Sequence, residues 1–136
     1  MKKIFLILLL MIAIISCTNS FTEKEMIGIY SPLDYKNTYD TIQLNEHNIY
    51  RRKVYDINKK LVLDTKGIWS VDEDVIVFKS PFFLNFDRDL EKFPELLQDT
   101  ISNGVGYIYL NNGTIKFCVG QASASLPNQN CYYKLK

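Results

Sequence analysis

The sequence predicts a mainly β protein, a small antiparallel meander barrel of about eight short strands with one short helix. Period-2 alternation of apolar and polar residues recurs from Met26 to the end of the chain, with turn residues between the runs. Aromatic residues make up 13% of the chain, mostly Tyr and Phe, and these types suit half-buried pleated surfaces. Asn112-Gly113 between two alternating runs is a strong hairpin signal. Closure would remove unpaired strand edges, and a β-sandwich is the alternative.

The alternation defines each strand. The candidate strands are Met26 to Tyr30, Tyr39 to Leu44, Ile49 to Tyr55, Leu61 to Val71, Val75 to Lys79, Gly104 to Leu110, Thr114 to Val119 and Cys131 to Leu135. In the run after Asn112-Gly113, Phe117 and Val119 share an apolar face with Ile115, whereas Lys116 and Cys118 take the other. We expect the apolar set to point inward, as in a sheet with one wet side.

One segment departs from the β pattern. Between Asp89 and Ser102, the apolar residues Phe93, Leu96, Leu97 and Ile101 recur at helical spacing. Pro94 suits a first turn and Gly104 follows the end. The segment predicts a short amphipathic helix.

The N-terminus has the layout of a secretory signal. Lys2 and Lys3 precede an apolar run from Ile4 to Ile15, which as a helix spans roughly 18 Å. A bilayer core of about 30 Å needs a longer run, so we expect a cleaved signal peptide.

A cysteine stands where this signal ends. Ile14-Ile15-Ser16-Cys17 resembles the bacterial lipobox, with an aliphatic residue three before the cysteine and a small residue directly before it. We therefore expect a signal peptide at 1–16, a lipidated tether at 17–25 and a barrel domain at 26–136, held in the cell envelope by lipid on Cys17. In enteric-type sorting rules an Asp directly after the cysteine favours inner-membrane retention, and Thr18 occupies that position. We therefore expect placement at the outer membrane if the cell has two membranes. An ordinary secretory signal is the alternative.

The charge balance excludes one class of partner. Cleavage would remove Lys2 and Lys3 from the 16 basic residues, against 15 acidic ones. The remaining domain is nearly neutral, with no basic patch for the phosphates of nucleic acid.

Five short motifs recur along the predicted strands: Gly28-Ile29-Tyr30, Asp40-Thr41-Ile42-Gln43-Leu44, Tyr50-Arg51-Arg52, Lys66-Gly67-Ile68-Trp69-Ser70 and Tyr132-Tyr133-Lys134. Together they resemble the pattern of the small lipocalin-like lipoproteins of bacteria. The resemblance implies a calycin-type meander barrel and no particular activity. In lipocalins the Gly-x-Trp motif lies on the first strand, whereas here Trp69 is in mid-chain.

Catalytic and metal-binding motifs are missing from the sequence. His47 is the sole histidine and falls in a predicted turn, and no nucleophile elbow, phosphate loop or His/Cys ligand pair is present. Asp72-Glu73-Asp74 lacks the ligand periodicity and glycine of a calcium loop, so we expect a charged hairpin tip. We expect no enzyme, cofactor or metal, and a hydrolase with unrecognised machinery is the residual alternative.

Several residues are candidates for ligand contact. Arg52 alternates with Tyr50 and Val54, which allows a structural ion pair, solvent exposure on the opposite phase, or contact with a ligand. Trp69 is expected in the core. The segment containing Phe82, Phe83 and Phe86 suits a pocket lip, or a plug that only completes the core.

Cys118 and Cys131 are expected to form a disulfide in an oxidising compartment. Alternation places Cys118 outward, whereas Cys131 shares a face with Tyr133 and Leu135, which we interpret as inward. Pairing Phe117 with Tyr133 would then require a bulge, which Gly120 permits.

These observations leave two main functional hypotheses. The first is a non-enzymatic, lipid-anchored envelope protein that binds a small apolar ligand in or at the mouth of the barrel. The second is a module that binds an envelope protein, such as an inhibitor or immunity factor. A cavity above about 300 Å³ would favour the ligand, whereas a filled barrel with an exposed apolar patch would favour a protein.

The lipobox predicts the outcome of one substitution. Cys17→Ser removes the sulfur on which the thioether to diacylglycerol is built, so the protein should lose fatty-acid label and leave the membrane fraction. Metabolic labelling with a radioactive fatty acid, followed by fractionation, measures both. Continued labelling of the variant would contradict the lipoprotein assignment.

Overall fold

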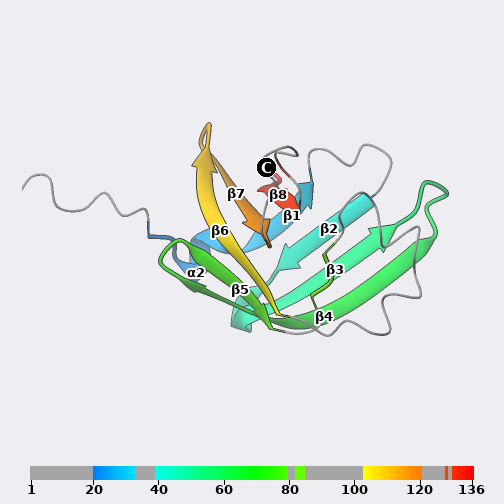
Figure 1. Ribbon diagram of the computed structural model, residues 1–136, viewed down its shortest axis with the longest axis horizontal. Helices are drawn as coiled ribbons and strands as arrows, with labels where there is room; N and C mark the ends of the chain where they lie inside the picture. The colour runs from blue at the N-terminus through cyan, green and yellow to red at the C-terminus, as the bar shows by residue number, and fades with distance from the viewer. Residues whose placement is uncertain (1–19, 33–38, 80–81, 85–102, 121–127, 129) are drawn as a thin grey trace, which may run out of the picture.

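Eight antiparallel strands close into a barrel in which each strand pairs with the next and β8 returns to β1 (Figure 1). The structure, a computed structural model, describes residues 20–32, 39–79, 82–84, 103–120, 128 and 130–136. The elements are α2 (Glu23–Met26), β1 (Gly28–Pro32), β2 (Tyr39–Leu44), the 3-10 turn η1 (Glu46–Asn48), β3 (Ile49–Tyr55), β4 (Leu61–Asp72), β5 (Val75–Lys79), β6 (Gly104–Asn111), β7 (Thr114–Val119) and β8 (Cys131–Lys134). The mainly β fold and the closed barrel are confirmed.

The strand bounds agree closely with the alternation pattern. β2, β3, β5 and β7 begin and end at the predicted residues. β1 begins at Gly28, later than predicted, because Met26 is the last residue of α2. The predicted helix from Asp89 to Ser102, and Cys17 with the predicted signal peptide, lie outside the described residues.

The short helix α2 packs against one end of the barrel. Thr22 and Glu25 form a capping box at its start, which satisfies backbone N–H groups that the helix leaves unpaired. Met26 is fully buried, and the Tyr30 hydroxyl donates a hydrogen bond to the Met26 carbonyl at 2.7 Å. The Phe21 N–H donates to the Glu73 carbonyl in the β4–β5 turn at 2.9 Å. No helix in the part of the chain that the structure describes is long and apolar enough to cross a membrane.

The register of β7 and β8 corrects one prediction. Phe117 lies opposite Tyr132, not Tyr133, and Cys118 lies directly opposite Cys131. Tyr132 is fully buried and points into the barrel. The expectation that Tyr133 and its neighbours in phase form the inward face of β8 is therefore wrong. The Cys118–Cys131 disulfide is present and needs no bulge between the paired residues. Closing a loop of this length stabilises a fold by about 3 kcal/mol.

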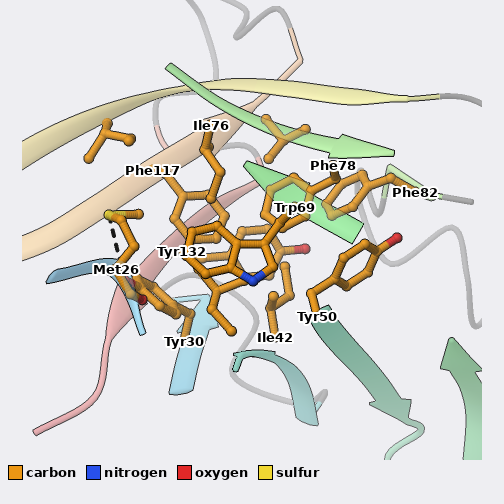
Figure 2. Packing of buried hydrophobic residues seen from close by; sticks show 13 residues of the cluster. Met26, Tyr30, Ile42, Tyr50, Trp69, Ile76, Phe78, Phe82, Phe117 and Tyr132 are labelled. Atoms are coloured by element: carbon orange, nitrogen blue, oxygen red, sulfur yellow. Dashed lines mark hydrogen bonds between the residues drawn. The ribbon is translucent and has the colours of Figure 1, made fainter. Parts of the chain in front are cut away.

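Aromatic side chains fill the centre of the barrel, with Trp69 among them (Figure 2). Trp69 is 1% exposed, and its indole N–H donates to the Asn45 carbonyl at 3.3 Å. Phe78 stacks on Phe82 with ring centroids 4.6 Å apart. Among the described residues, the larger cluster of buried core residues consists of Met26, Tyr30, Ile42, Leu44, Tyr50, Trp69, Ile76, Phe78, Phe82, Ile108, Phe117, Val119 and Tyr132.

The burial of Trp69 predicts a large loss of stability on truncation. Trp69→Ala should lower the free energy of unfolding by about 3 to 5 kcal/mol, since it removes a large core side chain and leaves a cavity. Ile68 is the matched control, because it is adjacent but 55% exposed on the outer face. Ile68→Ala should change stability by only about 0.5 kcal/mol. Denaturant melts compare the two, and equal losses would mean that Trp69 is not in the core.

Candidate functional site

A charged cluster lies inside the barrel, built around Arg52. Arg52 points inward with Tyr50 and Val54, so the structure selects one of the two strand phases that the sequence left open. Its side chain is 1% exposed. Asp40 on the neighbouring strand β2 is fully buried, and the two form an ion pair. Of the three possibilities that the sequence left open for Arg52, the structure shows the structural ion pair.

The geometry of this ion pair is bidentate. Arg52 donates from Nε to Asp40 Oδ1 at 3.0 Å and from Nη2 to Asp40 Oδ2 at 2.6 Å. Tyr132 on β8 accepts a second bond from Arg52 Nη2 at 2.7 Å and donates its hydroxyl proton to Asp40 Oδ2 at 2.9 Å. Because both charges are hydrogen-bonded as well as paired, the cost of their burial is offset.

The cluster also holds the segment that follows β5. Arg52 Nη1 donates to the Phe83 carbonyl, and the Arg52 guanidinium carbon lies 4.9 Å from the centroid of the Phe82 ring, a cation–π contact. Phe83 packs against Val54 and Leu63. Arg52 therefore joins β2, β3, β8 and the Phe82–Phe83 segment.

The charges of the cluster set its protonation. Burial lowers the pKa of the Arg52 guanidinium, but Asp40 and Tyr132 oppose this effect and raise the pKa above its ordinary value. Burial also raises the pKa of Tyr50 to about 12, with Arg52 opposing the rise. At neutral pH Arg52 is therefore positively charged and the Tyr50 phenol is protonated. This site has the character of a structural cluster more than of a proton-transfer site.

The structure places the predicted ligand-contact residues within the protein's own packing. Arg52, Trp69 and Phe82 are buried in contact with other core residues, and Phe83 is half-buried beside them. Phe86 lies outside the described residues. The arrangement of Phe82 is that of a plug that completes the core.

Sequence reasoning missed Asp40 and Tyr132. Asp40 occupies the same phase of β2 as the buried Ile42 and Leu44, so a carboxylate on an apolar face was the available signal for a partner to Arg52. Tyr132 gave no such signal, because Tyr133 beside it made both faces of β8 aromatic.

The remaining polar candidates are exposed. His47 lies in the turn η1 with φ of 63°, and Asp72, Glu73 and Asp74 lie at the tip of the β4–β5 hairpin. No group of His, Cys, Asp or Glu side chains among the described residues could hold a metal ion. A groove of about 340 Å³ is lined by Gly113, Thr114, Ile115, Lys134, Leu135 and Lys136. It lies between the start of β7 and the C-terminal end of the chain, outside the barrel interior.

The outer surface of the barrel has two unlike sides. On β2 to β4 the outward residues include the charged Arg51, Lys53, Asp64 and Lys66, and at one end the exposed pair Ile49 and Ile68. We call the other side the β5–β8 face and define it by its outward residues, which are Val75, Val77, Lys79, Val105, Tyr107, Tyr109, Asn111, Thr114, Lys116, Cys118, Cys131 and Tyr133.

Strand pairing makes the β5–β8 face continuous. Val105 lies opposite Val77, and Tyr107 lies between Val75 on β5 and Cys118 on β7. Val105, Tyr107 and Tyr109 are 51%, 57% and 48% exposed. A contiguous exposed apolar patch is often functional in soluble proteins.

Comparisons with known protein families, with curated proteins and with solved structures gave no match.

The buried ion pair predicts a contrast between two Asp→Asn substitutions. Asp40→Asn leaves the Arg52 charge buried without a counter-charge, so the free energy of unfolding should fall by about 3 to 5 kcal/mol. Asp64→Asn is the matched control, because Asp64 pairs with Arg51 in contact with solvent, where an ion pair stabilises little. Thermal or denaturant unfolding of both variants measures the difference. A similar, small loss in both would show that Arg52 is solvated.

Proposed function

We propose that this protein is a lipid-anchored envelope protein without enzymatic activity, which acts by binding another protein through its β5–β8 face. The observation that carries the proposal is the contrast between the two sides of the barrel. One side has mainly charged outward residues with exposed Ile49 and Ile68 at one end, whereas the other exposes Val105, Tyr107 and Tyr109 and has two lysines as its charged residues.

The composition of this face supports a protein partner. Tyr107 and Tyr109 stand two residues apart on the same face of β6, about 7 Å from each other along the strand. Tyrosine offers a large apolar surface with a polar tip and is enriched at protein interfaces. The Cys118–Cys131 disulfide lies within the face and links β7 to β8, which limits the conformational freedom that binding must remove.

The filled interior supports action at the outer surface. A ligand in the barrel would have to displace residues such as Trp69 and Phe82, which are each 1% exposed. Displacing a packed core side chain costs several kcal/mol, which a small apolar ligand would have to recover. An inhibitor or immunity factor, in contrast, needs only a rigid scaffold and an exposed face.

The lipobox at Ile14 to Cys17 supports the anchor. Two or three acyl chains, at about 0.8 kcal/mol per buried methylene, hold a protein at a membrane without a spanning helix. Anchoring would place the β5–β8 face among other envelope proteins at high local concentration.

Site-specific crosslinking in intact cells tests the proposal. The photoreactive amino acid p-benzoylphenylalanine replaces Tyr107 on the β5–β8 face or, as the control, Lys66 on the charged side. We expect protein adducts on irradiation of the first and few with the second, because a partner protein covers only the β5–β8 face. Equal yields at the two positions, or no adduct at Tyr107, would contradict the proposal.

A further inference from the structure

We propose that the hairpin of β6 and β7 is a membrane-contacting element, whose tip inserts into the headgroup region of the bilayer that holds the lipid on Cys17. The tip comprises Tyr109 to Ile115, at the turn between the two strands. The inference rests on the proposed lipid anchor and goes beyond the protein-binding role, because it assigns the end of the β5–β8 face to the phospholipid surface.

The hairpin projects beyond the neighbouring strand β5. Val75, the first residue of β5, lies opposite Tyr107 on β6. From there β6 continues to Asn111, four residues further, which at about 3.4 Å per residue is roughly 14 Å. Figure 1 shows the hairpin standing clear of the other strands. The tip is therefore accessible to a partner that the body of the barrel does not touch.

The tip exposes apolar side chains on both of its faces. Successive side chains of a strand point to opposite faces, so Tyr109 lies on the outer face and Leu110 on the inner one, in phase with the buried Ile108. Tyr109 is 48% exposed and Leu110 is 60% exposed. Leu110 lies opposite Ile115 on β7. A sheet with one wet side has one polar face, whereas this tip has none.

The tip carries no charge. The described residues from Asn103 to Ile115 include no charged side chain, and the polar groups at the tip are neutral amides and a hydroxyl. Charged side chains are costly within a bilayer, whereas tyrosine suits the boundary between acyl chains and water. Lys134 and Lys136 line the groove beside the tip together with Leu135. Cations in this position complement the phosphates of lipid headgroups.

The proposed anchor brings this hairpin to the membrane. The Phe21 N–H donates to the Glu73 carbonyl at 2.9 Å, and the Ile108 N–H donates to the Asp74 carbonyl at 2.7 Å. The segment that follows Cys17 and the base of the hairpin are thus attached to consecutive residues of one turn. Cys17 precedes Phe21 by four residues, which span at most about 14 Å. With lipid on Cys17, the tip can therefore reach the headgroups.

The charges at this end of the barrel select the hairpin as the part that contacts lipid. Glu23 and Glu25 on α2 and Asp72, Glu73 and Asp74 in the β4–β5 turn are exposed, and anionic headgroups repel them. At physiological ionic strength such repulsion is largely screened beyond about 8 Å. Because the tip extends further than this past the start of β5, it can touch the bilayer while the carboxylates stay in water.

Quenching of tryptophan fluorescence by brominated lipid tests this inference. The full-length lipidated protein is reconstituted into vesicles of phosphatidylethanolamine and phosphatidylglycerol with brominated or unbrominated acyl chains, as the Leu110→Trp or the Ile57→Trp variant. The emission of the unsubstituted protein, whose Trp69 is buried, is subtracted. We expect brominated lipid to lower the added emission of Leu110→Trp by about twofold or more, because a side chain at the boundary of headgroups and acyl chains lies near the bromine atoms.

Ile57 is the matched control. It is an apolar residue, 65% exposed, in the turn between β3 and β4 at the opposite end of the barrel (Figure 1). The emission added by Ile57→Trp should be the same in both kinds of vesicle. Tyr109→Trp is a second, conservative reporter at the tip and should be quenched as Leu110→Trp is. Resistance to proteolysis checks that each variant is folded.

Flotation of the vesicles and the mass of the purified chain separate the inference from the anchor on which it rests. If an acylated chain floats with the vesicles but both tip variants are quenched no more than Ile57→Trp, the hairpin contact is overturned and the anchor stays in place. A chain that lacks acyl mass and does not float would overturn both.

Discussion

The ion pair between Arg52 and Asp40 fixes the arrangement of parts of the chain that are far apart in sequence. Through Tyr132 it joins the last strand to β2 and β3, and through the Phe83 carbonyl it holds the segment after β5. A guanidinium needs several acceptors when it is removed from water. These acceptors come from separate elements, so the charge is tolerated only when the barrel is closed around it. The ion pair thus favours one closed arrangement over open ones.

The same cluster limits what the interior can do. Arg52 and its aromatic neighbours Phe82 and Tyr132 occupy the space that a ligand would need. On the far side of the core, Met26 and Trp69 fill the interior toward α2. Since the described interior is packed with the protein's own side chains, the exposed surface is the better place to look for function. There, the difference between the charged side and the β5–β8 face is the most informative feature.

Most strands could be predicted from the sequence because their alternation has a single interpretation. In β7, Phe117 and Val119 alternate with Lys116 and Cys118, and both the bounds and the inward face follow from this pattern. In β3 the pattern alone did not decide, because each phase of the strand carries both aromatic and basic residues. Asp40 on β2, which no local rule links to Arg52, selects the inward phase.

The wrong inward face of β8 and the wrong register of the disulfide also result from tertiary contacts that the sequence pattern does not show. In β8, Tyr132 and Tyr133 are equally suited to the interior, and the hydrogen bonds of Tyr132 to Arg52 and Asp40 decide which one points inward. The disulfide was predictable as a pair of cysteines but not in register, since the register depends on that choice. The four-residue helix α2 is too short to show helical periodicity, although Thr22 and Glu25 have the spacing of a capping box.

Native mass spectrometry of the full-length protein, extracted from its own envelope in a mild detergent, tests most directly the claim that the barrel is filled and acts through its surface. We expect masses of the lipidated chain, alone or with a protein partner, and no additional small molecule. A small molecule bound once per chain and released when the protein unfolds would contradict it, because the interior would then have room for a ligand.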